Sequence, residues 1–176
     1  MKTRIFNEHF PIGGRSGSTT VARLRAVLPF KRRQQACQQT RAMEGDEIRI
    51  ELARGTILRA GDLLRAADGT LLEIVAAPEY VSTVITHDSS QLARVAYHLG
   101  SRQVALQIGP GWVRYLFDHV LDVTVARLGL DVTHSDETFE PEPSSHGSHA
   151  SSSHSHSDRE RHRGSFDEHR TAHREQ

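Results

Sequence analysis

Histidine is the residue type whose number and placement in this chain best suit chemistry. Seven of the twelve histidines fall in the last 33 residues, which contain only three apolar side chains. Imidazole nitrogen suits nickel, copper and zinc, whereas magnesium and calcium prefer oxygen ligands. Closely spaced imidazoles can wrap around one ion in several ways, so we expect adaptable and exchangeable metal binding. The seven are His146, His149, His154, His156, His162, His169 and His173.

Two further properties of this stretch bear on metal binding. Ligation needs the neutral ring, and an unperturbed histidine titrates near ~6.5, so capture should weaken as the pH falls. The scarcity of apolar side chains predicts that residues 144–176 form a disordered tail. A soluble tail with incidental histidines is the alternative, because composition alone does not prove metal binding.

Five histidines lie in the rest of the chain, among them His119. It is flanked by Asp118 and Asp122, and we expect it to face solvent or a partner from a helix. A lone exposed histidine is more often an ordinary surface residue. His134 and Asp136 form a short pair that suggests weak metal binding, but such pairs are common by chance.

The composition excludes several classes of protein. Lys plus Arg and Asp plus Glu both number 22, so the formal net charge is zero, which argues against a general nucleic-acid or anionic-membrane binder. No apolar run is long enough to span a membrane, and the N-terminus lacks the apolar core of a secretory signal, so we expect a cytoplasmic protein. The single cysteine, Cys37, excludes an internal disulfide framework. Because no phosphate loop or nucleophile–base pair is visible, we do not expect an enzyme.

The sequence predicts an α+β chain with two domains before the tail. Residues 1–20 are predicted to be a flexible leader, because proline and glycine break any periodicity there. Residues 21–79 alternate apolar and polar side chains, most clearly at Ile48, Ile50 and Leu52. They predict a small N-terminal β domain of the peptide- or partner-binding type.

Residues 80–143 alternate strand and helix and predict a ferredoxin-like βαββαβ domain. One helix is expected to end at Gly100, and the next to run from Phe117 until Gly129 stops it. The second helix is expected to have an apolar face made of Phe117, Val120, Leu121, Thr124 and Leu128. The strands expected in this domain are 81–86, 104–108, 112–115 and 130–133.

Several motifs of the chain form a specific combination. In the second half they are Ala96-Tyr97-His98-Leu99-Gly100-Ser101-Arg102, Leu106-Gln107-Ile108, Arg114-Tyr115, Asp118-His119-Val120-Leu121-Asp122 and Phe139-Glu140-Pro141-Glu142 before a His-rich tail. In the first half they are Arg54-Gly55-Thr56-Ile57-Leu58 and Gly61-Asp62. Together these motifs resemble the UreE family of urease accessory proteins, which are nickel metallochaperones. The resemblance covers about residues 21–143 and the character of the tail.

The resemblance implies a homodimer that binds Ni²⁺ and delivers it for assembly of the urease active site. It also implies the urease apoprotein complex and its accessory GTPase as partners, with no nucleic acid or membrane among them. Copper outbinds nickel at nitrogen ligands and zinc competes, so Cu²⁺ and Zn²⁺ are further candidate ions. Docking to the correct partner must therefore supply the selectivity.

Two positions depart from the family pattern. Gln103 occupies the position of a histidine that binds metal at the dimer interface, and Phe117 stands where some members have a further metal histidine. His119 is the position that matches. Glutamine is a poor replacement for imidazole on nickel, which leaves open whether the interfacial site is absent, weaker or rebuilt from tail histidines. It also leaves open whether the chain is a divergent second copy of the accessory protein.

Two other functions stay open beside nickel delivery. One is a general intracellular buffer for nickel, copper or zinc, which shares the tail chemistry but needs no docking surface. The other is a urease assembly chaperone that has lost its interfacial metal. Recovery of urease or its GTPase in a pull-down from cells would favour delivery over buffering.

Overall fold

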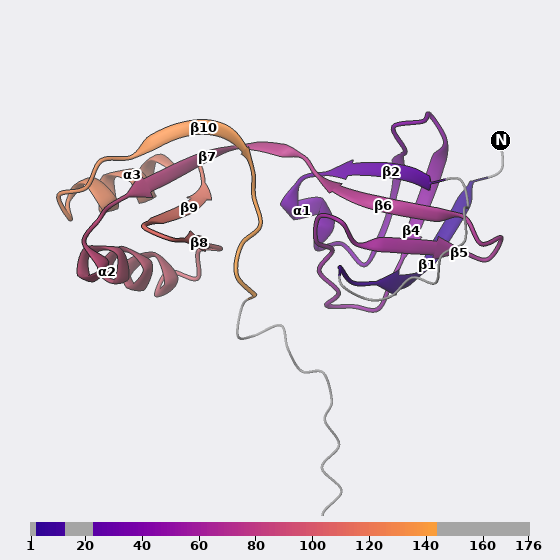
Figure 1. Cartoon of the computed structure of the whole chain (residues 1–176), viewed down its shortest axis with the longest axis horizontal. Coiled ribbons are helices and arrows are strands. Elements are labelled where there is room, and N and C mark those ends of the chain that lie inside the picture. Colours follow the sequence, from indigo (N-terminus) through magenta and orange to yellow (C-terminus); the bar gives the residue numbers. More distant parts are fainter. Residues whose placement is uncertain (1–2, 13–22, 144–176) are drawn as a thin grey trace, which may run out of the picture.

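The structure, a computed structural model, describes residues 3–12 and 23–143 and has two units joined where β6 passes into β7 (Figure 1). Residues 1–2 and 13–20 of the predicted leader and the predicted disordered tail lie outside the described residues. Within the described ranges, no helix is long and apolar enough to cross a membrane.

The N-terminal unit is a six-stranded mixed sheet with the strand order β2-β6-β5-β1-β4-β3. The pairs β1–β4 and β2–β6 are parallel, and the other neighbours are antiparallel. Alternate side chains, such as Ile48 and Ile50, point into one buried core, as the apolar pattern predicts. The elements are β1 (Arg4–Phe10), β2 (Arg23–Leu28), a short helix α1 (Phe30–Arg33), β3 (Cys37–Arg41), β4 (Glu47–Glu51), β5 (Leu63–Ala66) and β6 (Leu71–Ala76).

The first strand shows that the prediction of a flexible leader over residues 1–20 was wrong at its start. Strand β1 lies between β5 and β4, inside the sheet rather than at its edge. Only Phe6 of this strand is buried, so its sequence lacks the alternation that identifies a strand. The register with β5 also shifts between Phe6 and Glu8. The position of β1 is therefore set by its two neighbours rather than by its own periodicity.

The C-terminal unit has one antiparallel sheet with the strand order β10-β7-β9-β8. Its two helices contribute Val95, Leu99 and Val125 to a second core. Val84, Val113 and Tyr115 of the sheet and Leu106 before β8 complete this core. The elements are β7 (Pro78–Ile85), α2 (Ser89–Gly100), β8 (Gln107–Gly109), β9 (Trp112–Leu116), α3 (His119–Ala126) and β10 (Thr133–Thr138).

Two strands of this unit lie at different positions from those predicted. The last strand begins at Thr133 and runs to Thr138, whereas the sequence predicted 130–133. Leu130 and Val132 pack against the core from the preceding loop instead of pairing, so their apolar character did not mark a strand. The strand predicted over 104–108 is reduced to β8.

The second helix starts two residues later than predicted, and only part of the predicted apolar face, Leu121 and Leu128, packs against the core. The side chain of Asp118 caps the helix by accepting hydrogen bonds from the backbone N–H groups of Val120 and Leu121, so the helix begins at His119. Phe117 and Val120, predicted for the apolar face, are 45% and 65% exposed. Val125 is the buried residue of α3.

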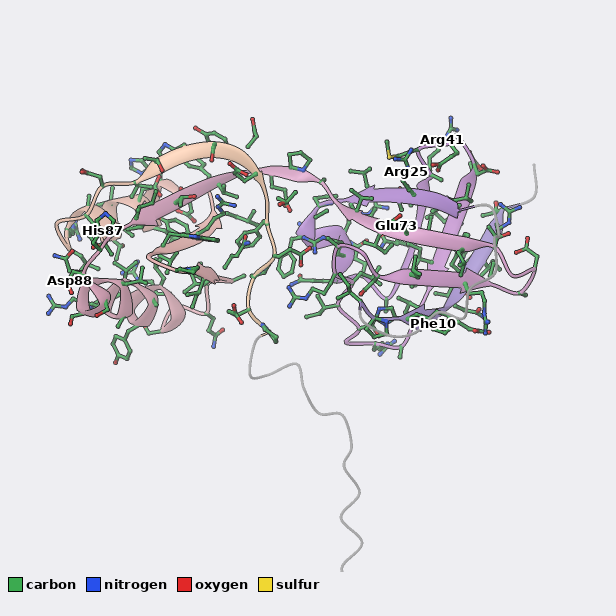
Figure 2. The ribbon with its side chains drawn as sticks, viewed as in Figure 1. Phe10, Arg25, Arg41, Glu73, His87 and Asp88 are labelled. Atoms are coloured by element: carbon green, nitrogen blue, oxygen red, sulfur yellow. The ribbon has the colours of Figure 1, made fainter. Side chains whose placement is uncertain are left out.

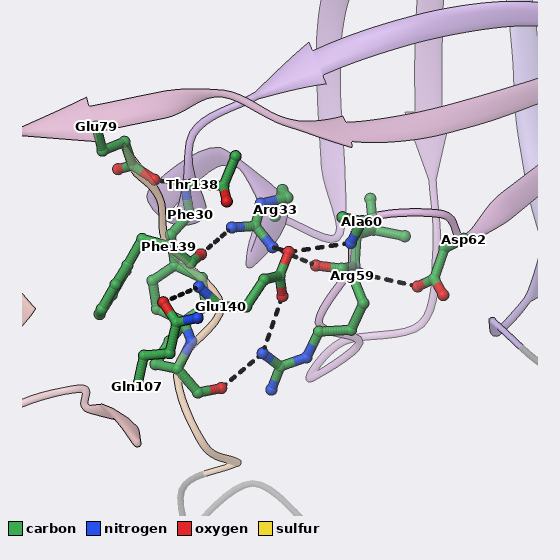
Figure 3. A network of polar contacts seen from close by, with 12 residues as sticks. Phe30, Arg33, Arg59, Ala60, Asp62, Glu79, Gln107, Thr138, Phe139 and Glu140 are labelled. Carbon is green, nitrogen blue, oxygen red and sulfur yellow. Dashed lines mark hydrogen bonds and ion pairs between the residues drawn. The ribbon is translucent and has the colours of Figure 1, made fainter. Parts of the chain in front are cut away.

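The segment that follows β10, residues 139–142 and named the strap here, packs the C-terminal unit against the N-terminal one (Figure 3). The buried Phe139 ring lies edge-on to Phe30 of α1, with ring centroids 5.5 Å apart. The strap also bonds the C-terminal unit, since the N–H of Glu142 donates to the carbonyl of Leu106. It therefore fixes the place where the chain reaches Pro143, the last described residue.

A buried arginine provides the polar part of this contact. Arg33 is fully buried and donates to Glu140 at 2.6 Å, and also to the carbonyl oxygen of Phe139. The other carboxylate oxygen of Glu140 accepts from Arg59 at 3.2 Å. The backbone N–H of Ala60 donates to Glu140 as well. One carboxylate of the strap thus forms ion pairs with two guanidinium groups of the N-terminal unit.

Candidate metal-handling site

His119, the candidate ligand of the folded part of the chain, is the first residue of α3 and is exposed. Residues three apart on a helix share a face, so His119 and Asp122 lie on the same side of α3. Among the described residues, no three His, Cys, Asp or Glu groups converge to hold a metal ion. In a single chain, His119 is therefore an open and accessible donor rather than part of a closed site.

Asp122 connects α3 to two strands of the sheet. One carboxylate oxygen accepts from the hydroxyl of Tyr115 at 2.8 Å, and the other lies 2.9 Å from Nε2 of His134. Burial opposes ionisation of Asp122, but the hydrogen bonds from Tyr115 and His134 hold the pKa of this carboxyl below its ordinary value. Burial, and then the bond to Asp122, raise the pKa of Tyr115, so the phenol stays protonated. The carboxylate is therefore ionised at neutral pH and fixed from two sides.

Gln103, at the position of the interfacial ligand in the family pattern, follows α2 in a tight turn. Its φ of 59° lies in the left-handed region that few residues other than glycine adopt. It lines a groove of about 700 Å³ between the two units, together with Phe30, the end of the strap at Glu142, and Pro143. An amide here offers a neutral oxygen or an N–H group, neither of which replaces imidazole on a borderline metal.

The remaining histidines of the described ranges do not gather around these residues. His9 pairs with Asp62 at 2.8 Å in the N-terminal unit. His87 lies beside Asp88 at the end of the C-terminal unit farthest from the N-terminal sheet (Figure 2). His98 is exposed on α2. The seven tail histidines lie outside the described residues, so their role as ligands stays a prediction.

The contact between His134 and Asp122 is the feature that the sequence did not reveal. The sequence suggested His134 with Asp136, but the partner of the His134 ring is a carboxylate twelve residues earlier. Residues on a helix and on a strand that far apart meet only through tertiary packing. Spacing alone could have found this pair only if the register of β10 beside β7 had been known.

Comparisons with known proteins agree across both units. The family model for the N-terminal domain of the UreE urease accessory protein matches residues 14–77, and the model for its C-terminal domain matches residues 79–173. The chain is 49% identical to the urease accessory protein UreE of Alkalilimnicola ehrlichii over 121 residues, 69% of this chain and 74% of that one.

Two further relatives cover more of the chain. The UreE proteins of Aliivibrio fischeri and Proteus mirabilis are 41% and 42% identical over 133 and 130 residues. These alignments span 76% and 74% of this chain and 82% and 81% of the relatives. Both domains and most of the length match proteins that assist urease and are not urease itself. The chain therefore belongs to the UreE family of urease accessory proteins.

Proposed function

We propose that this protein is a nickel-binding metallochaperone that carries Ni²⁺ for assembly of the urease active site. The observation that carries the proposal is the placement of seven histidines after Pro143, in a chain whose family assists urease. The match to the C-terminal family model runs to residue 173 and so includes all seven. Imidazole is a ligand that nickel accepts readily, and a set of similar ligands allows exchange.

The position of the strap supports a proposed order in which the metal ion is captured and then transferred. Because Glu140 and Phe139 tie the strap to the N-terminal unit, Pro143, the last described residue, lies at a defined place in the groove that Gln103 lines. We propose that the tail captures the ion and that His119 takes part in its onward transfer. Each transfer replaces one nitrogen ligand by another, so the ion stays divalent and no redox step is needed.

The partners of the proposal are a second copy of the chain, the urease apoprotein complex and its accessory GTPase. The chain has no phosphate loop, so GTP hydrolysis would belong to the partner. The strand order β10-β7-β9-β8 supports a ferredoxin-like C-terminal domain, and exposed Tyr97 and Ile108 offer apolar surface to a second copy. We place the protein in the cytoplasm, where these partners would meet.

A second candidate function rests on Gln103. If the interfacial metal site of the family needs a histidine there, the chain acts as an assembly chaperone for urease without holding nickel between its subunits. That function predicts activation of urease that does not depend on the tail histidines.

Co-expression with urease and its other accessory proteins at limiting nickel separates the two functions. The test compares the wild-type chain with a variant in which all seven tail histidines are replaced by glutamine, which keeps length and solubility. A nickel carrier predicts that urease activity falls with the variant and returns when nickel is raised. Equal activation by both forms at limiting nickel would contradict nickel delivery by the tail and favour the second function.

A further inference from the structure

Strand β10 forms one edge of the C-terminal sheet and has β7 as its neighbour on one side only (Figure 1). It pairs with β7 over six consecutive residues without a shift of register. In an antiparallel pair, only alternate residues direct their backbone N–H and C=O groups to the neighbouring strand. Among the described residues, no backbone hydrogen bond joins β10 to any segment other than β7. The backbone groups on its outer side can therefore bind a further strand.

The usual protections of an edge strand are weak in β10. Such edges are commonly blocked by lysine, proline, a bulge or a covering segment. Strand β10 contains neither lysine nor proline, and its side chains are exposed apart from the half-buried Ser135. Its charged side chains are carboxylates, which repel an acidic strand and attract a basic one. The edge is therefore open to an extended segment of the right charge.

The carboxylates along β10 favour a basic segment on physical grounds. Glu137 lies directly opposite Glu79 of β7, so two like charges share one face of the sheet. Like charges in that position destabilise a pair of strands. Arg114 approaches Glu137 only to 4.0 Å, and Asp136 adds an exposed carboxylate on the other face. A lysine or arginine opposite Glu137 on an added strand would offset this repulsion.

The face that carries Asp136 also offers apolar surface beside the same edge. Asp136 is paired with Tyr80, whose side chain is 50% exposed. The centroid of the Tyr80 ring lies 5.1 Å from that of Phe117, which is exposed as well, and 5.8 Å from that of His134. Diagonal neighbours on a sheet are within reach of aromatic side chains. An added strand would therefore meet apolar rings on one face and carboxylates on the other, which suits alternating apolar and basic residues.

We propose that β10 is a docking edge for a partner protein that contributes an extended segment in which basic and apolar side chains alternate. The inference rests on the proposed function, in which docking to a partner supplies selectivity, and it adds the surface and the chemistry of that contact. A second copy of the chain does not fit this edge, because its own β10 carries two carboxylates and no lysine or arginine. Pairing two copies of β10 would bring like charges together.

The probe is a fluorescein-labelled synthetic peptide of alternating lysine and valine, and fluorescence anisotropy measures its binding to the full chain. We expect saturable binding that weakens as salt is added, and no binding of a peptide of alternating glutamate and valine. Glu137→Lys should weaken binding of the lysine peptide by about threefold to tenfold, because repulsion replaces attraction. Glu47→Lys, an equal change of charge at an exposed position of β4, is the matched control and should leave affinity unchanged.

Two N-methylated forms of the lysine peptide test the addition of a strand itself. One form lacks the N–H groups of its valines and the other lacks those of its lysines, and only one of these sets would face β10. We expect one form to lose binding and the other to keep it. Equal binding of both forms, failure of the unmodified peptide to bind, or wild-type affinity of Glu137→Lys would overturn the inference.

Two further measurements separate this inference from a contact between copies and from the proposed function. Light scattering should give the same mass for Glu137→Lys and the wild type; a change in mass would place a second copy at β10 and overturn the inference. Dialysis against Ni²⁺ should give equal binding by the two forms. A wild-type chain that binds Ni²⁺ but not the peptide would refute the docking edge alone, whereas failure to bind Ni²⁺ would refute the proposed function.

Discussion

The contact between the strap and the N-terminal unit predicts the effect of one conservative change, Glu140→Gln. The amide keeps the shape of the side chain but removes the charge that balances Arg33 and Arg59. Arg33 is fully buried, so water cannot replace the lost carboxylate around its guanidinium. The change therefore leaves a buried positive charge without its counter-ion, which is the costly way to disrupt an ion pair.

The expected size follows from the burial of the two partners. Breaking a buried ion pair on one side costs about 3–5 kcal/mol. The Glu140 side chain is 26% exposed, so solvent already screens part of the interaction and we expect about 2–3 kcal/mol. At about 2–4 °C for each kcal/mol in a chain of this size, the melting midpoint should fall by about 4–12 °C.

Thermal unfolding followed by circular dichroism measures this shift. Glu137→Gln is the matched control, because the Glu137 carboxylate is nearly half exposed and only 4.0 Å from Arg114, where an ion pair contributes little. We expect the control to melt close to the wild type. If Glu140→Gln melted at the same temperature as the control, the strap would not hold the two units together as described.

Three further outcomes follow from the fold and the site. Phe6→Ala should lower the free energy of unfolding by about 3–5 kcal/mol in urea titrations, because Phe6 is fully buried in the first core; wild-type stability would mean that β1 is dispensable. Asp122 has a lowered pKa in the folded chain, so its contribution to stability is complete above the ordinary aspartate pKa of ~3.9 and is lost as the pH falls through the lower folded value. Asp122→Asn should therefore melt below the wild type at pH 7, and the two should converge on acidification; a constant difference across that range would contradict the role of this carboxylate. Light scattering after size exclusion should give twice the chain mass of 19.7 kDa, and a mass equal to that of one chain would contradict the proposed homodimer.

Local patterns predicted those elements whose side chains alternate or repeat by themselves. Ile48 and Ile50 marked β4 because one face of that strand is buried and the other is not. Strand β1 was not predicted, because Phe6 is its single buried residue and its place depends on pairing with strands more than forty residues away. Strand β10 (Thr133–Thr138) was not predicted at its true position for a similar reason, since this edge strand has almost no buried side chain.

The candidate site was predictable in part for the same physical reason. His119 was expected on a helix and is the first residue of α3, but Asp118 was not recognised as the cap and that helix was expected to begin at Phe117. The contact of His134 with Asp122 could not be predicted from the sequence, because it depends on how β10 lies beside α3. The charges of Arg33 and Glu140 are separated by more than a hundred residues and meet only once both units have folded.

Equilibrium dialysis of the intact chain against Ni²⁺ at neutral pH tests nickel carriage most directly. We expect more than one Ni²⁺ bound per dimer, and we expect a chain ending at Pro143 to lose most of that capacity. Lowering the pH below the histidine pKa of ~6.5 should release the ion, because ligation needs neutral imidazole. An intact chain that stays essentially free of Ni²⁺ at neutral pH, or a shortened chain with undiminished capacity, would contradict the proposal that its histidines carry nickel to urease.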